Sequence, residues 1–305
     1  MITLKRSTVN VARQSGYHAD RSLKDKVVVV SGASRGIGRE IAIRAATDGA
    51  KVALLAKTDT PNPKIAGTLP ETAESVRAAG GEPLALVCDI RDPDSVTAAA
   101  NSVADTFGGV DVVVNNAGAL DLRATPKLPL KNFERLLAVN VMGPFALVQA
   151  TLPYLRKSDN AHIVSVSPPL NLQPAWVAAH VGHTVGKYAE SLLTLGWAAE
   201  FASIPIAVNS LWPATTVAST GMMAAMGEEE VRAQARSPQI MADALHALVT
   251  RPADKCTGHF YTDEEVLAEE GIETFDGYRL AAREQDLTPN FYLPDVALPI
   301  IRVSQ

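Results

Sequence analysis

A histidine and a lysine four residues apart, His183 and Lys187, have side chains that can take part in proton transfer. His183 and Lys187 lie in the segment 180–202, whose pattern predicts a helix, and residues at i and i+4 share one helix face. An imidazole with an ordinary pKa near ~6.5 can act as an acid or a base. A nearby ammonium lowers that pKa and favours the neutral ring, which still donates one hydrogen bond. Tyr188 lies roughly 140° off this face at ~3.6 residues per turn, so it cannot replace His183.

A glycine-rich turn near the N-terminus is a second group of residues with chemical meaning. The segment Ser31–Gly38 reads SGASRGIG, follows the apolar run VVVVS and opens a helical pattern. Gly32 permits a tight turn, Gly36 lets the backbone approach a pyrophosphate, and Gly38 lets the helix pack closely on the strand. Because a second predicted strand follows about 20 residues later, this context predicts a dinucleotide-binding site.

The end of the second predicted strand selects between the two nicotinamide dinucleotides. A carboxylate at this place would bind both ribose hydroxyls of NAD, but the sequence LLAKT offers Lys57 instead. Arg35 adds a second cation from the glycine turn. Two cations near the adenosine ribose favour a 2′-phosphate, so NADP(H) is the predicted cofactor. The alternative interpretation is that both are solvated surface charges.

The alternation of apolar runs with helical patterns predicts the fold that positions these residues. Short apolar runs lie at 27–31, 52–56, 84–88, 111–115, 162–166, 206–212 and 258–262. Helical patterns lie at 36–48, 71–80, 93–107, 131–157 (interrupted near Gly143 and Pro144), 180–202 and 238–250. Repeated βαβ units predict a single doubly wound α/β Rossmann domain over residues 25–285. Its seven-stranded parallel sheet would be flanked by helices.

The two ends of the chain differ from this pattern. Residues 1–19 contain Lys5, Arg6 and Arg13 and no acid. Residues 1–24 are therefore interpreted as an N-terminal arm, with a transit peptide as the alternative. The segment 286–305 contains three prolines and is predicted to be an extended C-terminal tail, of a kind that often packs on a partner subunit.

Composition argues against several classes of function. The 305 residues are 47% hydrophobic with a mean hydropathy of +0.07, enough to bury a sizeable core. The net charge of −5 and the lack of a basic stripe argue against a nucleic-acid partner. No apolar run approaches the ~18–20 residues that span a bilayer, so no membrane span is predicted. Two distant cysteines argue against a disulfide framework or a zinc site. They favour a reducing compartment, the cytoplasm, or the mitochondrion if residues 1–24 are a transit peptide.

The glycine spacing GxxxGxG and further motifs resemble the short-chain dehydrogenases/reductases from about residue 25 to 262. The motifs are CDI at 88–90, NNAG at 115–118, Asn140 in LLAVNV, Lys187 four residues after position 183, and Pro213 in LWPAT. Ala214 stands where the family has a glycine. The stretches 56–69, 162–176, 209–216 and 269–278 narrow the resemblance to the hydroxysteroid dehydrogenase-like proteins.

The resemblance implies hydride transfer between a nicotinamide cofactor and a carbonyl or alcohol carbon. It implies cofactor contacts at Gly32, Ser34, Arg35, Gly36, Ile37, Gly38, Lys57, Asp89, Ile90, Asn116, Ala117, Gly118, Lys187, Pro213, Thr215 and Thr216. It implies catalytic roles for Asn140, Ser167, His183 and Lys187. Two of the catalytic positions depart from the family, which has a tyrosine at 183 and a second serine where this chain has Pro168. Ser167 aligns with the first serine, and Ser165 is the weaker candidate.

His183 leaves two interpretations open. One is an NADP(H)-dependent oxidoreductase in which the histidine transfers the proton. The other is a nucleotide-binding protein without redox turnover, a sensor or scaffold, because an imidazole is shorter than a phenol. Both predict NADPH binding, so turnover divides them.

Apolar residues near the predicted nicotinamide end favour a small hydrophobic carbonyl or alcohol substrate. They are Leu170, Leu172, Trp176, Trp212, Met222, Met223 and Met226. Ordinary lid or subunit packing is the alternative interpretation of these side chains. The resemblance also implies a homodimer or homotetramer.

Overall fold

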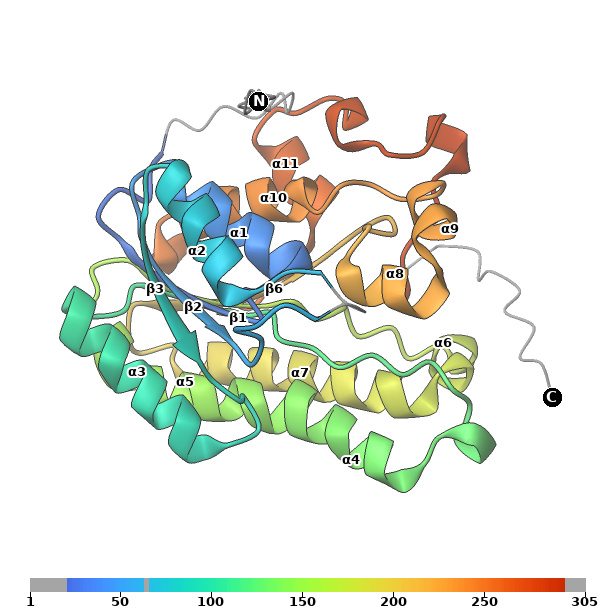
Figure 1. Ribbon diagram of the computed structural model, residues 1–305, viewed down its shortest axis with the longest axis horizontal. Helices are drawn as coiled ribbons and strands as arrows, with labels where there is room; N and C mark the ends of the chain where they lie inside the picture. The colour runs from blue at the N-terminus through green and yellow to red at the C-terminus, as the bar shows by residue number, and fades with distance from the viewer. Residues whose placement is uncertain (1–20, 63–65, 294–305) are drawn as a thin grey trace, which may run out of the picture.

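A seven-stranded parallel sheet forms the centre of the structure, a computed structural model that describes residues 21–62 and 66–293 (Figure 1). The strand order is β3-β2-β1-β4-β5-β6-β7. The strands are β1 (Val27–Ser31), β2 (Lys51–Ala56), β3 (Glu82–Val87), β4 (Val112–Asn115), β5 (Ala161–Ser165), β6 (Ile206–Trp212) and β7 (Phe260–Thr262). The order reverses between β1 and β4, which confirms the predicted doubly wound fold and places a crevice at that point.

Helices cover both faces of the sheet (Figure 1). One face carries α1 (Gly36–Ala46), α2 (Leu69–Ala78), α10 (Gln239–Val249) and α11 (Asp263–Glu269). The other carries α3 (Pro93–Phe107), α4 (Leu130–Leu137), α5 (Gly143–Leu155) and α7 (Val181–Glu200). The shorter helices α6 (Pro174–Ala179), α8 (Thr220–Met226) and α9 (Glu228–Arg232) lie beyond the carboxyl ends of the strands. Single 3-10 turns lie at Thr125–Lys127, Ala253–Lys255, Asp276–Tyr278 and Glu284–Asp286.

Local sequence signals explain where several helices begin and end. At α2, the Thr68 side chain accepts from the Glu71 backbone while the Glu71 carboxylate accepts from the Thr68 backbone, a capping box. The Asp92 side chain caps α3, and Gly108 ends that helix in the left-handed conformation at φ 89°. These caps satisfy backbone groups that a helix terminus leaves without partners.

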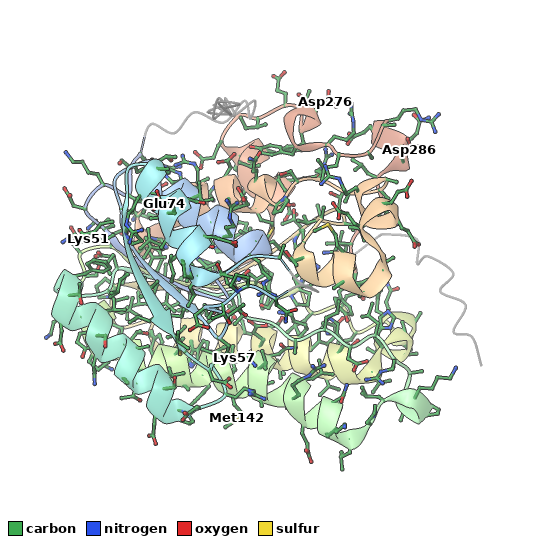
Figure 2. The ribbon with its side chains drawn as sticks, viewed as in Figure 1. Lys51, Lys57, Glu74, Met142, Asp276 and Asp286 are labelled. Atoms are coloured by element: carbon green, nitrogen blue, oxygen red, sulfur yellow. The ribbon has the colours of Figure 1, made fainter. Side chains whose placement is uncertain are left out.

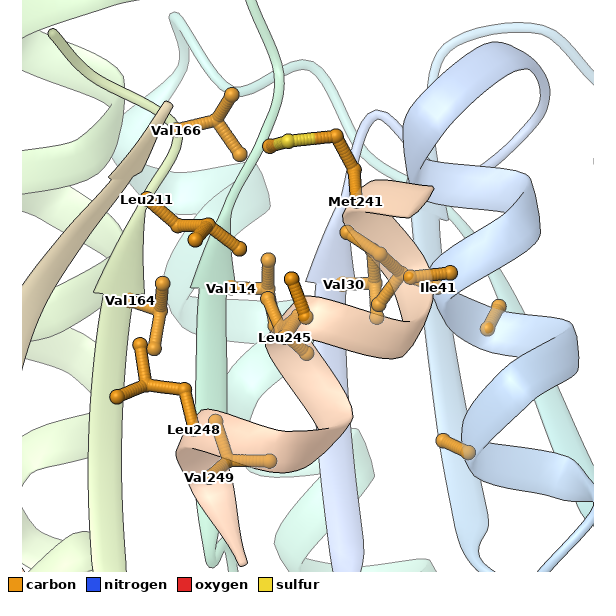
Figure 3. Packing of buried hydrophobic residues seen from close by; sticks show 14 of the residues in the cluster. Val30, Ile41, Val114, Val164, Val166, Leu211, Met241, Leu245, Leu248 and Val249 are labelled. Carbon is orange, nitrogen blue, oxygen red and sulfur yellow. The ribbon is translucent and has the colours of Figure 1, made fainter. Parts of the chain in front are cut away.

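The core is divided by the sheet into two layers, as alternation along each strand requires. Val28 and Val30 of β1 point to the face covered by α1 and α10, whereas Val27 and Val29 point to the face covered by α3, α5 and α7. In Figure 3, Met241, Leu245 and Leu248 of α10 face the strand residues Val30, Val114, Val164 and Leu211. Strands buried on both faces explain why the sequence shows continuous apolar runs.

A π-helical turn, Ala138–Met142, joins α4 to α5 and carries Asn140. The resulting continuous stretch, Leu130–Leu155, is long and apolar enough to cross a membrane by length and composition alone. In the structure α5 packs against α3 and β4, and α4 packs against α7. This stretch is therefore part of the helical layer that covers one face of the sheet. The predicted interruption near Gly143 is this π-helical turn, and Pro144 occupies the first turn of α5.

Candidate active site

A cavity of about 580 Å³ opens at the carboxyl ends of the strands, beside the point where the strand order reverses. It runs from the glycine turn after β1, past the ends of β2 and β4, to α7 and the loop after β6. The predicted site residues that line it are Gly32, Ser34, Arg35, Gly36, Ile37, Lys57, Asp89, Ile90, Asn116, Ala117, Gly118, His183, Lys187 and Pro213. The fold thus brings most of the predicted nucleotide contacts to one cavity with the histidine–lysine pair.

The glycine turn leaves no room for side chains where backbone segments meet. A Cβ on Gly38 would lie 2.4 Å from Asn116 Nδ2 and 2.6 Å from the Gly32 carbonyl oxygen. Gly32 has φ +68°, and a Cβ there would lie 2.9 Å from Ala117 Cα. Asn116 closes the cradle from the other side, because its Nδ2 donates to the Ser31 carbonyl over 2.9 Å. This packing against α1 fits a pyrophosphate held at a helix N-terminus.

The far end of the cavity carries the cations predicted to select the cofactor. Arg35 Nη2 donates to the Gly67 carbonyl over 2.9 Å, while its Nε is buried without a hydrogen-bond partner among the described residues. Lys57 is exposed directly after β2. Asp89 forms a hydrogen-bonded ion pair with Arg91, which holds the pKa of that carboxyl at about 2. An Arg35 group without a partner fits an anionic ligand.

His183 lies on the first turn of α7 and lines the cavity with only 4% of its surface exposed. Burial lowers the pKa of His183 to about 3, and the positive charge of Lys187 acts in the same direction. The expected neutral ring is therefore the state favoured at neutral pH. Among the described residues the buried Nδ1 atom has no hydrogen-bond partner, whereas the Ala119 backbone hydrogen-bonds to the ring and acts to raise its pKa.

Lys187 lies one turn further along α7, and its ammonium is fixed by two acceptors. Nζ donates to the Val166 carbonyl over 2.8 Å and to Glu190 Oε2 over 2.8 Å. It also lies 5.8 Å from the centroid of the Trp212 ring. Glu190, which is fully buried, was not predicted from the sequence. Its spacing of three residues from Lys187 on an apolar helix is the signal that could have found it.

Asn140 is buried behind the cavity and binds backbone instead of lining the pocket. Its Oδ1 accepts from the Ala119 amide over 2.7 Å, and its Nδ2 donates to the Ala119 carbonyl over 3.0 Å. This pair of bonds fixes the segment that follows β4. A Cβ on Gly186 would lie 3.3 Å from Asn140 Nδ2, so α7 packs closely on the π-helical turn. Asn140 thereby positions the wall of the cavity beside His183.

The structure places Ser167 away from the cavity lining, so its contact with a substrate stays a prediction. This side chain is fully buried outside the cavity lining, and its Oγ lies 3.2 Å from Ser210 Oγ on β6. The cause is the turn after β5, in which the Ser167 amide donates to the Ser165 carbonyl. Val166 lines the cavity at this point.

Two other predicted contacts, Thr215 and Thr216, lie outside the cavity lining and hold the C-terminal segment. The Thr216 amide donates to the Thr288 carbonyl over 2.8 Å, and Thr215 forms a β-bridge with Pro289. This segment then crosses the end of the cavity, where Asn290 and Phe291 contribute to the lining.

Aromatic packing holds the C-terminal segment in place. Tyr292 is fully buried at φ 70°, and its hydroxyl lies 3.0 Å from Thr184 Oγ1. Trp212 Nε1 donates to the Phe291 carbonyl over 3.0 Å, and Asn171 Nδ2 donates to the Leu293 carbonyl over 3.0 Å. The sequence predicted an extended tail, but a hydrogen bond 79 residues apart gives no local signal.

Fewer apolar residues line the cavity than the sequence predicted. Of the seven apolar residues proposed for it, Trp212 and Met222 line the cavity. Trp176 is buried among the rings of Phe291 and Tyr292, and Leu172 is exposed to solvent. The others outside the lining are Leu170, Met223 and Met226.

The chain is similar to known dehydrogenases over most of its length. A family described as short chain dehydrogenase matches residues 26–231. Hydroxysteroid dehydrogenase-like protein 2 from Homo sapiens is 42% identical over 268 residues, 88% of this chain and 63% of the relative, so the chain spans less than two thirds of that protein. A putative dehydrogenase from Xanthomonas campestris is 46% identical with a TM-score of 0.85, covering 90% of this chain and 100% of that one.

Solved neighbours include complexes with a nicotinamide cofactor. A metagenomic short-chain oxidoreductase in complex with NADP is 26% identical with a TM-score of 0.65, over 79% of this chain and 97% of that one. A short-chain dehydrogenase from Mycobacterium paratuberculosis bound to NAD is 24% identical with a TM-score of 0.69, over 81% of this chain and 99% of that one. The second of these shows a shared fold alone.

Proposed function

The chain belongs to the short-chain dehydrogenase/reductase family, and from this premise we propose that it is an NADP(H)-dependent oxidoreductase acting on a small hydrophobic carbonyl or alcohol. The observation that carries the proposal is that His183 and Lys187 line the same cavity as the glycine turn. A dinucleotide bound along the turn would extend toward this pair. The apolar residues around them, Trp212 and Met222 among them, suit a hydrophobic substrate.

The residues of the cavity divide the chemistry between them. NADPH, when bound, supplies the hydride. His183 offers its unpartnered Nδ1 to the substrate oxygen, accepting from an alcohol when the other ring nitrogen carries the proton and donating to a carbonyl in the other neutral tautomer. Lys187 favours the neutral ring and presents positive charge to the nicotinamide ribose. Turnover of NADPH with a panel of hydrophobic aldehydes and ketones tests the assignment.

A second candidate function, nucleotide binding without turnover, rests on one observation. The hydroxyl of Ser167 is bound to Ser210 outside the cavity, so the partner that would orient a substrate oxygen is not supplied there. A sensor or scaffold of this kind would bind NADPH through the same glycine turn. Turnover by the purified protein separates the two functions.

Cofactor preference yields a first prediction. Replacing Lys57 with serine should raise the Kd for NADPH by about tenfold and leave the Kd for NADH nearly unchanged, because only NADPH carries the 2′-phosphate. The Kd values are measured by titration followed by nucleotide fluorescence. The wild-type protein should bind NADPH more tightly than NADH.

Lys51 provides the matched control for Lys57. The two lysines lie at opposite ends of β2 (Figure 2), and Lys51 lies 5.9 Å from the centroid of the Phe107 ring, away from the cavity. Lys51→Ser should therefore bind both nucleotides as the wild type does. An equal loss of NADPH and NADH affinity in Lys57→Ser would contradict a role in selecting the phosphate.

We also propose that the protein is a homodimer or homotetramer assembled through the outer face of α5 and α7. The exposed apolar side chains of this face are Met142, Phe145, Val181, Val185, Leu192 and Leu195. Met142, which is 62% exposed, lies on the outer side of its helical layer (Figure 2). Exposed apolar side chains gathered on two adjoining helices favour burial against a second copy of the chain.

Disruption of this face yields a second prediction. Leu192→Lys should shift the protein to a monomer in light scattering coupled to gel filtration, because an unpaired ammonium cannot be buried without cost. Leu172→Lys, at an exposed leucine in the loop before α6, should leave the assembly intact. Monomeric wild-type protein would contradict the proposed interface.

For the compartment we propose the cytoplasm. The alternative, the mitochondrion, depends on cleavage within residues 1–24, most of which lie outside the described residues. N-terminal sequencing of the protein recovered from its native source distinguishes the two.

A further inference from the structure

A buried ion pair forms the back wall of the cavity. Glu190 is fully buried on α7, and its Oε2 accepts from Lys187 Nζ over 2.8 Å. The side chain of Lys187 is only 9% exposed, and its ammonium also reaches the Val166 carbonyl. An ammonium has three N–H donors, so one remains for a ligand in the cavity that Lys187 lines.

The second oxygen of this carboxylate is unsatisfied. Glu190 Oε1 is buried without a hydrogen-bond partner. Burial raises the pKa of Glu190 to about 7, although Lys187 acts to lower it. A buried carboxylate with one bare oxygen is costly to ionise, so its protonation state can change near neutral pH.

The elements packed on α7 bring few other charges toward this pair. Strand β5 contributes His162, whose pKa is lowered by burial to about 4, so it is neutral near pH 7. Helix α4 contributes Lys131, Glu134 and Arg135. Strand β6, α6 and the π-helical turn carry no ionisable side chain. Lys187 is the charged group that acts on Glu190 most directly.

Ionisation of Glu190 changes the charge that the wall presents. With Glu190 protonated, the pair carries the full positive charge of Lys187. With Glu190 ionised, the pair is neutral, and the field that Lys187 exerts on a ligand is reduced. A dinucleotide carries negative charge on its phosphates, so its affinity would depend on the charge that this wall presents.

We propose that Glu190 is a positioning residue that sets the charge Lys187 presents to NADP(H), so that affinity for the cofactor falls when Glu190 is ionised. The inference rests on the proposed function, because it requires NADP(H) to bind in this cavity. By reciprocity, bound NADP(H) favours the protonated form of Glu190. The expected behaviour is a pH-dependent affinity that removal of the carboxylate abolishes.

The test compares the Kd for NADPH of the wild type and Glu190→Gln between about pH 5.5 and pH 8.5. The 2′-phosphate titrates identically in both proteins, so the ratio of the two Kd values isolates Glu190. The ratio of wild type to variant should be close to one at the acidic end and rise to about tenfold at the basic end. Glu200→Gln, at an exposed position on the same helix, should give a ratio of one throughout.

The other outcomes would refute either the role of Glu190 alone or the proposed function as well. NADPH binding with a ratio that does not vary with pH would give Glu190 a structural role only and sink the inference alone. Absence of NADPH binding by the wild type would refute the proposed function and the inference together. If Glu190→Gln does not fold, as judged by circular dichroism, Glu190→Met is titrated in its place with the same expected ratio.

Discussion

Replacing His183 with alanine is expected to lower kcat for NADPH-dependent carbonyl reduction by about 10²–10⁴-fold, the usual contribution of a positioned acid or base. The Kd for NADPH should change by less than about threefold, because the glycine turn and Lys187 still bind the dinucleotide. His183 is the titratable side chain one helical turn from Lys187 that lines the cavity, and its Nδ1 has no protein partner. Stopped-flow and steady-state kinetics measure the two effects separately.

His180 supplies the control for this substitution. It lies one turn earlier, its Nδ1 is bonded to the Leu122 carbonyl over 2.9 Å, and it does not line the cavity. His180→Ala should therefore keep kcat within about threefold of the wild type. Equal losses in both variants would indicate a general disturbance of α7 instead of a loss of proton transfer at His183.

The pH profile gives a further check on His183. Because burial lowers the pKa of His183 to about 3, the ring stays neutral over the range in which a free histidine titrates. We expect no acidic limb from His183 in kcat/KM between about pH 5 and pH 8. For stability the sign is set by a folded pKa below the unfolded value of about 6.5. The contribution of His183 is complete above that value and is lost as the pH falls toward 3.

Substitution of Gly38 by alanine is expected to lower the free energy of unfolding by about 1–3 kcal/mol and to weaken NADPH binding by more than tenfold. The added Cβ would meet the Gly32 carbonyl at 2.6 Å and Asn116 Nδ2 at 2.4 Å. The first of these is backbone of the glycine turn itself, so relief of the clash must displace the turn. Denaturant unfolding and nucleotide titration measure the two effects.

Gly109, in the loop after α3, is the matched control, since the chemical change is the same and the surroundings are open. A Cβ at Gly109 meets nothing within 4 Å among the described residues. Gly109→Ala should therefore keep the free energy of unfolding within about 1 kcal/mol of the wild type and leave NADPH binding unchanged. Unchanged stability and NADPH binding in Gly38→Ala would contradict the close packing of the turn on α1.

The fold could be predicted from the sequence because its signals are local. Each predicted strand is present, and α3 has the predicted bounds, 93–107. The glycine turn could also be predicted, since a short run of glycines after an apolar strand specifies its own backbone geometry. Lys187 and His183 were assigned from the family resemblance, and helical spacing placed them on one face of the helix.

The remaining parts of the site depend on contacts between distant segments. Ser167 was predicted to face a substrate, but its hydroxyl contacts Ser210 on β6, a residue 43 positions away in the sequence. Phe291 reaches the cavity only because the tail folds back over Trp212. Glu190 lies in an apolar helix. Its pairing with Lys187 becomes apparent only when both side chains are known to be buried.

Turnover by the histidine is the central claim, and one comparison tests it most directly. NADPH consumption by the wild type, His183→Ala and His183→Tyr is measured against the same panel of hydrophobic aldehydes and ketones. The account predicts turnover of at least one substrate by the wild type and its loss in His183→Ala. Absence of turnover in the wild type together with its appearance in His183→Tyr would contradict the account, and would identify a nucleotide-binding protein without redox activity.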